Sequence, residues 1–183
     1  MAAEWEKLRQ KVEGLQAEIA RFEVDFLDRD GFKEFCDNFM LETEGYLDIC
    51  ITGYFSETIR KSLENTIERR HKVRLVCPEL SESVRDKKNL EALKKLASVG
   101  AEIRVNNRLH ARFLVAYNRP FGGLLVIGSF DFNTECMGRE RYDAGIKTKH
   151  PDLVNSAIAL FEQIWTEPES QTLEEFIKKR NEK

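Results

Sequence analysis

The sequence predicts an α/β fold: a mixed, mostly parallel sheet flanked by helices in an α-β-α sandwich, preceded by an amphipathic N-terminal helix. Between residues 46 and 128, short apolar runs alternate with segments of helical periodicity, which is the pattern of strands interleaved with helices. Proline and glycine mark boundaries between them, as at Pro78 and Gly100. In residues 1–26 the apolar positions recur instead at alternating steps of three and four, as in an amphipathic helix.

The apolar stripe of this N-terminal segment predicts one long helix. Its members are Trp5, Leu8, Val12, Leu15, Ile19, Phe22 and Phe26. Such a stripe either packs on the chain's own domain or pairs with the same helix of a second copy. About three heptads are short for a free coiled coil, so pairing would need the support of a globular contact. Both arrangements are open at this point.

The other elements follow in chain order. Strands are expected at 47–52, 72–77, 102–106, 109–117, 124–128 and 142–149. Helices are expected after Ser56 as an N-cap, at about 87–98 with Gly100 as its stop, from Pro151 to Trp165, and at 172–183. Residues 118–123 join two strands as a loose hairpin, so an antiparallel pair is inserted into a largely parallel sheet.

Length and composition limit the number of domains. A chain of 183 residues with 42% hydrophobic content fits one core plus an appendage better than two full domains. We therefore divide the chain into an N-terminal heptad helix at 1–30, one α/β domain at 31–168 and a polar C-terminal helix at 169–183.

Charge and hydropathy exclude further classes. A net charge of −3 and a pI of about 5.8 give no general attraction to nucleic acid or to an anionic membrane, so any basic site must be local. No apolar run approaches the roughly 20 residues of a membrane span, and the N-terminus does not resemble a signal peptide. We expect a soluble cytoplasmic protein without a membrane partner.

The cysteines and histidines show no pattern of metal ligands. The four cysteines are scattered at Cys36, Cys50, Cys77 and Cys136. Cys50 and Cys77 lie in apolar strand-like runs, where a thiol acts as a small hydrophobe. The three histidines, His71, His110 and His150, lack ligand spacing with one another or with a cysteine. We predict structural thiols, no metal site and no cofactor.

A polar cluster is predicted where two apolar strands end. His110 and Arg112 are two residues apart on one expected strand, so their side chains should share a face of the sheet. The next strand ends in a turn at Gly128-Ser129 that is followed by Asp131 and Asn133. This turn should bring those side chains close to the point at which His110 emerges.

These residues resemble the signature segment of the phospholipase D superfamily, in its single-motif, nuclease-like branch. That signature reads His-x-Lys, four residues, Asp, then Gly-Ser-x-Asn, and the corresponding segments here are 109–115 and 126–130. The order of the flanking strands and helices is similar as well, so the resemblance covers roughly residues 33–168. It implies that the 31–168 domain is a phospholipase D-like sandwich.

The resemblance also implies a mechanism. In that family two signature segments meet at one site, where one His attacks phosphorus to form a phosphohistidine and the other protonates the leaving group. A chain with one segment then implies a homodimer. Carried over, His110 is the nucleophile and Asp143 is the downstream carboxylate that orients it. The phosphate-binding positions are Arg112, Ser129, Asp131 and Asn133.

The signature is degenerate at three positions. Arg112 replaces Lys, Asp131 replaces Asn, and Tyr117 stands in place of the motif's Asp. Arg112 and Asp131 can pair with each other, and the Asp131 carboxylate would repel a phosphodiester, so we expect weak or lost phosphodiesterase activity.

The alternative is that Arg112 binds phosphate, Asn133 takes over the amide role and Asp131 faces away. Nearby arginines would then form an anion-binding groove. Two other interpretations of these arginines are a solvated surface and a contact with another protein. They are Arg104, Arg108, Arg119, Arg139 and Arg141.

Three functions therefore remain open. The first is a diverged homodimeric module that binds a phosphodiester, in particular nucleic acid, with weak or lost cleavage. The second is an active, metal-independent nuclease or phosphodiesterase that acts through a phosphohistidine at His110. The third is a non-catalytic interaction or regulatory module whose working surface is the N-terminal helix. Whether the chain is an enzyme is thus undecided by the sequence.

Overall fold

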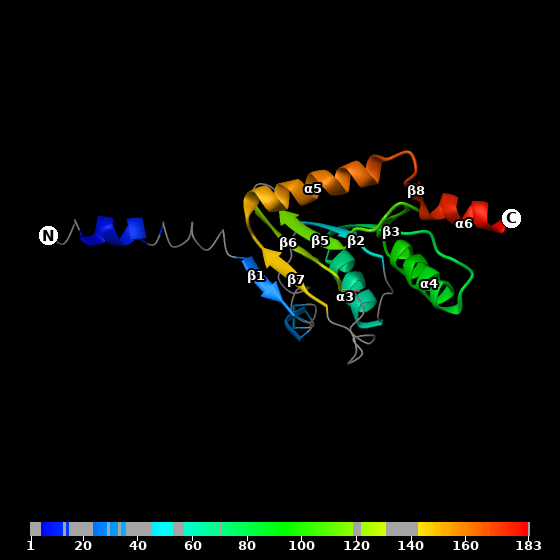
Figure 1. Ribbon diagram of the computed structural model, residues 1–183, viewed down its shortest axis with the longest axis horizontal. Helices are drawn as coiled ribbons and strands as arrows, with labels where there is room; N and C mark the ends of the chain where they lie inside the picture. The colour runs from blue at the N-terminus through cyan, green and yellow to red at the C-terminus, as the bar shows by residue number, and fades with distance from the viewer. Residues whose placement is uncertain are drawn as a thin grey trace.

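The computed structural model describes residues 5–12, 14, 24–28, 30–32, 34–35, 45–52, 57–69, 71–118, 122–130 and 143–182. At its centre is a sheet of eight strands in the order β1-β7-β6-β5-β2-β3-β4-β8 (Figure 1). The strands are β1 Val24–Leu27, β2 Tyr46–Cys50, β3 Lys72–Cys77, β4 Glu102–Val105, β5 Phe113–Asn118, β6 Gly122–Gly128, β7 Gly145–Thr148 and β8 Gln171–Thr172. The helices are α3 Glu57–Glu68, α4 Val84–Ser98, α5 Pro151–Thr166 and α6 Leu173–Asn181.

Helices cover both faces of this sheet. Helices α3 and α4 lie on one face and α5 lies on the other (Figure 1). Strand residues alternate between the two cores: Leu114 and Ala116 of β5 pack toward α3 and α4, whereas Val115 of the same strand packs toward α5. The expected mixed α/β sheet flanked by helices is therefore confirmed.

The expectation of a mostly parallel sheet is wrong. Among the described strands, only β2–β3 and β3–β4 pair in parallel, and the other five pairs are antiparallel. Parallel neighbours need a long crossover, which here α3 and α4 supply. Strands β5 and β6 are joined by three residues, which permit only an antiparallel pair.

The start of β5 also differs from the expected residue 109. Asn106 makes a tight turn: its side-chain oxygen accepts from the backbone N–H of Arg108 at 2.8 Å, and its carbonyl accepts from Leu109 at 3.2 Å. This turn engages the backbone N–H of Leu109, the first residue of the expected strand, and β5 begins at Phe113. His110 therefore lies in the β4–β5 loop, and strand alternation no longer fixes its face relative to Arg112.

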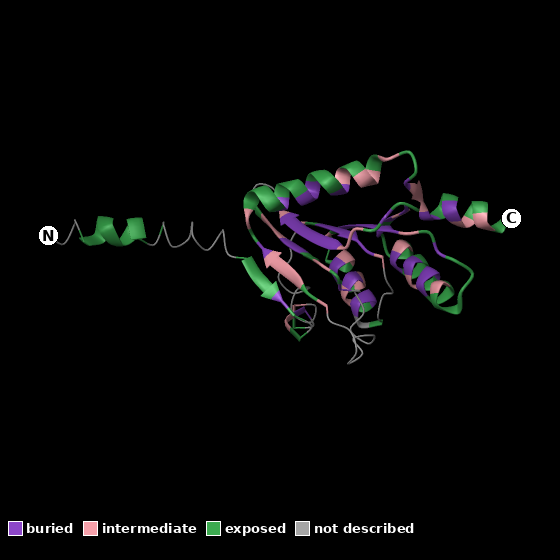
Figure 2. Cartoon of the chain, in the orientation of Figure 1, coloured by how far each residue is buried: buried purple, intermediate pink, exposed green. Residues whose placement is uncertain are grey.

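The N-terminal segment is helical at residues 5–12, as expected. Trp5, Leu8 and Val12 are exposed there (Figure 2). Leu15, Ile19 and Phe22 lie outside the described residues. Phe26, the last member of the expected stripe, lies instead in β1, which pairs antiparallel with β7. The single long helix expected through Phe26 is therefore wrong at its end, because the chain there satisfies its backbone groups by joining the sheet edge.

Two of the four cysteines lie in the described residues, and both are buried, free thiols. Burial raises the pKa of Cys77 to about 12, and burial together with Asp48 raises the pKa of Cys50 further. Both therefore stay protonated at neutral pH and behave as the small hydrophobes that the sequence predicted. Cys36 and Cys136 are outside the described residues.

In the part of the chain that the structure describes, no helix combines the length and apolarity that crossing a membrane requires. The same residues contain no group of three or more His, Cys, Asp or Glu side chains that could hold a metal ion.

Candidate functional site

His110 is exposed on the loop between β4 and β5. The loop is held in place by Asn106, whose buried side chain donates to Ser170 Oγ at 2.8 Å and to Glu167 at 3.2 Å. Both partners follow α5, so the loop is anchored to the end of that helix. The imidazole is thus carried on a fixed backbone and faces solvent.

Arg112 joins the ends of three strands. Its Nε donates to Thr52 Oγ1, just after β2, and one terminal nitrogen donates to the carbonyl of Ser129, just after β6. Its own carbonyl accepts from the N–H of Gly128 at 3.3 Å. The guanidinium is therefore oriented by protein oxygen atoms at the point where these strands end.

Ser129 forms hydrogen bonds with the two residues that directly precede β7, Asp143 and Ala144. Its hydroxyl donates to Asp143 Oδ1 at 2.7 Å and accepts from the N–H of Ala144 at 3.2 Å, while its own N–H donates to Ala144 at 3.0 Å. The resemblance implied that Asp143 accepts from the His110 ring. In this structure the Asp143 carboxylate accepts from Ser129, and its orientation of the His110 ring stays a prediction.

Glycine is required at this edge for a steric reason. A Cβ on Gly128 would lie 2.6 Å from the carbonyl oxygen of Ala144, and a Cβ on Gly145 would lie 2.6 Å from that of Ile127. No side chain fits at such distances without moving the backbone. The glycine of the Gly-Ser turn thus permits the close approach that brings Ser129 and Asp143 together.

The structure brings four of the six predicted site residues to one edge of the sheet. Arg112, Ser129 and Asp143 are linked there by hydrogen bonds, and His110 lies two residues before Arg112. Thr52 is an additional member that the sequence did not indicate. Asp131 and Asn133 lie outside the described residues, so the expected pairing of Arg112 with Asp131 stays a prediction.

The predicted cluster of arginines is only partly described, and its two described members differ. Arg104 lies 4.9 Å from the ring centroid of Trp165 and donates to two carbonyls, those of Trp165 at 2.8 Å and Ser170 at 3.0 Å. Arg104 therefore fixes β4 against the end of α5 and the residues that follow that helix. Arg108 is exposed beside His110 and forms an ion pair of 3.6 Å with Glu169. The other members, Arg119, Arg139 and Arg141, are outside the described residues.

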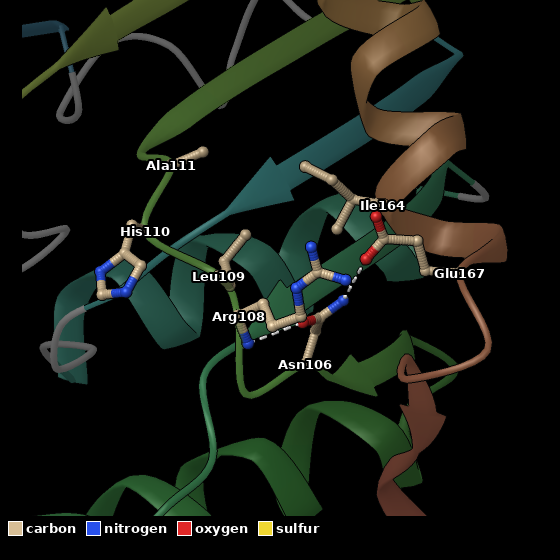
Figure 3. A pocket seen from close by; sticks show the side chains of 7 residues that line it. All are labelled: Asn106, Arg108, Leu109, His110, Ala111, Ile164 and Glu167. Atoms are coloured by element: carbon tan, nitrogen blue, oxygen red, sulfur yellow. Dashed lines mark hydrogen bonds between the residues drawn. The ribbon is translucent and has the colours of Figure 1, made fainter.

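A pocket of about 290 Å³ lies next to this edge (Figure 3). The residues that line it belong to the β4–β5 loop and to the end of α5: Asn106, Arg108, Leu109, His110, Ala111, Ile164 and Glu167. His110 is the predicted site residue among them. The pocket extends the candidate site in the direction of α5.

A comparison with protein families identifies the family of the domain that carries this site. The family model described as "Cardiolipin synthase, PLD-like domain" matches residues 38–165, which is more than half of the chain. The chain belongs to this phospholipase D-like domain family. The resemblance found in the sequence is thereby confirmed. No curated protein matches the chain.

Solved structures show the same phospholipase D-like fold. Nuc from Salmonella typhimurium, a phospholipase D family member, superposes with a TM-score of 0.64 at 14% identity, covering 82% of this chain and 95% of Nuc. NucT from Helicobacter pylori gives 0.65 at 11% identity, covering 82% and 99%. TrmBL2, an archaeal chromatin protein, gives 0.59 at 11% identity, covering 93% and 62%. At such low sequence identities these similarities show a shared fold alone.

In this phospholipase D-like domain the position of the motif's Asp is occupied by Tyr117, which belongs to a buried polar network. Tyr117 donates to Asp48 at 2.9 Å, and Arg74 donates to both oxygens of Asp48 at 2.7 Å each. Arg74 also donates to Glu162 on α5 at 2.7 Å and lies 4.9 Å from the ring centroid of Phe161. The carboxylate beside Tyr117 is thus that of Asp48, which belongs to β2, the strand next to β5.

This network perturbs the pKa values of its members. Burial disfavours the charged form of Arg74, but hydrogen bonds from Arg74 to Asp48 and Glu162 outweigh burial and raise its pKa. Burial and the negative charge of Asp48 raise the pKa of Tyr117 to about 12. This network was not predicted from the sequence, although a carboxylate inside the apolar run Leu47-Asp48-Ile49 indicates a buried charge that needs a cationic partner.

Proposed function

We propose that this protein binds phosphodiesters, in particular nucleic acid, at the sheet edge formed by His110, Arg112, Ser129 and Asp143, with weak or lost phosphodiesterase activity. The observation that carries the proposal is the hydrogen bond of 2.7 Å from Ser129 to Asp143. It engages both the hydroxyl of the Gly-Ser turn and the carboxylate that would orient a nucleophilic imidazole.

The hydrogen bonds of Arg112 support attraction without efficient cleavage. A guanidinium has five N–H donors, and here two of them already serve oxygen atoms of Thr52 and Ser129. A phosphate that replaced them would have to break contacts that orient the side chain. The charge itself remains and attracts a phosphate, although the nearby Asp143 carboxylate offsets part of that attraction.

Nucleic acid is supported as the ligand by the relatives and by exposure. Among the structures with the same fold, TrmBL2 is described as a chromatin protein with a novel mode of DNA binding. On this chain the exposed residues Arg108 and His110, two positions apart, lie at the candidate site, where a flexible polyanion can reach them. A local basic site of this kind is compatible with the net charge of −3.

We further propose that two copies associate and place their His110 residues in one cleft. The support is the single signature segment in a chain whose family joins two such segments at one site. Sedimentation velocity of the full chain at micromolar concentration tests this directly. A strictly monomeric protein would rule out the shared cleft.

The ligand is tested by fluorescence anisotropy with labelled single- and double-stranded DNA and RNA at low salt. We expect dissociation constants on the order of 1–100 µM near physiological salt, tightening as the salt concentration falls. His110→Ala and Arg112→Ala should weaken binding, whereas Arg85→Ala, which removes an exposed charge from α4, should not. Absence of binding to every probe rejects the proposal.

The same samples test cleavage when they are incubated with EDTA. We expect little or no product from the unmodified protein. Efficient cleavage that His110→Ala abolishes would establish the second candidate function, an active phosphodiesterase. That candidate is favoured by one feature, the exposure of His110, which lines a pocket.

A further inference from the structure

The pocket beside His110 has two chemically different ends. His110 lies at one end and the carboxylate of Glu167 lies at the other, with Leu109 and Ile164 between them (Figure 3). Its volume of about 290 Å³ is at the lower limit of small-molecule pockets, which span about 300–1,000 Å³. A flat group of the size of one nucleobase suits such a space.

The Glu167 carboxylate is held in a defined orientation. One of its oxygens accepts from the side-chain amide of Asn106 at 3.2 Å, and Asn106 is itself buried and bound to Ser170 at 2.8 Å. A carboxylate offers about four acceptor positions, so this hydrogen bond leaves capacity for a ligand. The polar group that the pocket offers at this end is therefore an oriented acceptor with a negative charge.

Such an acceptor distinguishes among the nucleobases. Guanine presents N1–H and N2–H side by side on its Watson–Crick edge, and both can donate to one carboxylate. Adenine and cytosine place a ring acceptor beside their amino group, and thymine or uracil flanks N3–H with two carbonyls. In each of these a carboxylate faces at least one repelling lone pair, so Glu167 favours guanine.

Arg108 adds a surface for the face of the base. It lines the pocket, is exposed and is held by Glu169 at 3.6 Å. A guanidinium stacks on a nucleobase and also attracts the adjoining phosphates. Leu109 and Ile164 supply the apolar contacts that a planar ring needs.

From these features we propose that the pocket binds an unpaired guanine base of a single-stranded nucleic acid whose phosphate lies at His110. This inference rests on the proposed function and names the ligand class more narrowly. Base recognition comes from Glu167, and attraction to the backbone comes from the charges around His110.

The test compares three labelled thymidine oligonucleotides of about 12 residues by anisotropy. The first has thymine alone, the second has two central guanines, and the third has two central hypoxanthines in place of the guanines. Hypoxanthine keeps N1–H but lacks the N2 amino group. We expect the guanine probe to bind about tenfold more tightly than the thymine probe, with the hypoxanthine probe between them. This comparison uses the unmodified protein and depends on no variant.

A pair of matched variants assigns the preference to its residue. Glu167→Gln keeps an acceptor for Asn106, and therefore the loop, but replaces half of the acceptor edge by an amide donor. We expect it to remove the guanine preference while binding of the thymine probe stays within about twofold. Glu174→Gln removes the same charge from the exposed first turn of α6, outside the pocket lining, and should keep the preference.

The outcomes separate the two proposals. Equal affinities of the unmodified protein for the three probes overturn guanine recognition and leave phosphodiester binding intact. A preference that survives in Glu167→Gln also overturns the assignment. Failure to bind any oligonucleotide overturns both.

Discussion

The two polar clusters of this protein differ in how far their side chains are exposed to solvent. The buried network of Asp48, Arg74, Tyr117 and Glu162 is closed, because three strands and a helix supply partners for one another inside the domain. The edge cluster of His110, Arg112, Ser129 and Asp143 lies where the strands end, and His110 faces solvent. The first can stabilise the fold, and the second can meet a ligand.

The difference is informative because both clusters involve positions of one signature. Tyr117 stands at the signature's Asp and belongs to the closed network, while His110 and Arg112 stand at its other positions and belong to the open edge. A charge buried in the domain makes stability sensitive to its removal, whereas an exposed one contributes little to stability. Substitutions should therefore separate stability from binding.

The largest effect is expected for Asp48→Ala. Asp48 is fully buried, and its removal leaves the guanidinium of Arg74 with part of its charge uncompensated in the core. We expect the free energy of unfolding to fall by about 3–5 kcal/mol in urea denaturation. Glu162→Ala is the matched control, because that side chain is 45% exposed, and its loss should be about 1 kcal/mol or less. Equal losses in the two variants would contradict the contrast.

The second-largest effect is expected for a substitution in the edge cluster. Arg112→Ala should lower the affinity for a labelled oligonucleotide about tenfold and should reduce the slope of log affinity against log salt by about 1. The reason is the loss of one fixed positive charge at the sheet edge. Anisotropy titrations at several potassium chloride concentrations measure both quantities. An unchanged salt slope would place the ligand elsewhere.

A smaller effect, with a defined pH dependence, is expected for Tyr117→Phe. It removes the hydrogen bond to Asp48 and should cost about 1 kcal/mol of unfolding free energy at neutral pH. Because burial raises the pKa of Tyr117 to about 12, above about 10 in an unfolded chain, this contribution is complete below about pH 10. It is lost as the pH rises through about 12. Urea unfolding at about pH 8 and about pH 11 should show the difference between the two proteins shrinking; a constant difference would argue against a buried phenol.

The smallest effect is expected for the stability of His110→Ala. Its side chain is exposed, so the free energy of unfolding should change by no more than about 0.5 kcal/mol. The same variant should still weaken oligonucleotide binding. A loss of several kcal/mol in urea unfolding would mean that His110 belongs to the folded core and would remove the distinction between the two clusters.

Much of the local structure was predictable, because local patterns determine it. Strand β3 occupies residues 72–77 as predicted, and Gly100 ends the turn after α4 with a positive φ of 113°. The cluster at the sheet edge was also predictable, because its residues lie next to strand ends and match a known signature. The wrong start of β5 came from the Asn106 side chain, whose turn interrupts an apolar run.

Contacts between residues far apart in the sequence were harder to predict. Asp48 and Arg74 are 26 positions apart, and the Asp48–Tyr117 bond spans 69, so no local pattern connects them. The hydrogen bond from Ser129 to Asp143 joins residues 14 positions apart, one directly after β6 and the other shortly before β7. The direction of strand pairing depended likewise on which strands became neighbours.

The sequence by itself determined the α/β class, most of the strands and helices, the family and the segment around His110, because periodicity, caps and motif spacing act over a few residues. The tertiary structure alone decided the strand order, the partners of Arg112 and Asp143, the closed network around Asp48 and the pocket between Glu167 and His110. Those features depend on which side chains meet after the sheet has formed, and hydrogen-bond geometry, which tolerates only tenths of an ångström, selects among the candidates.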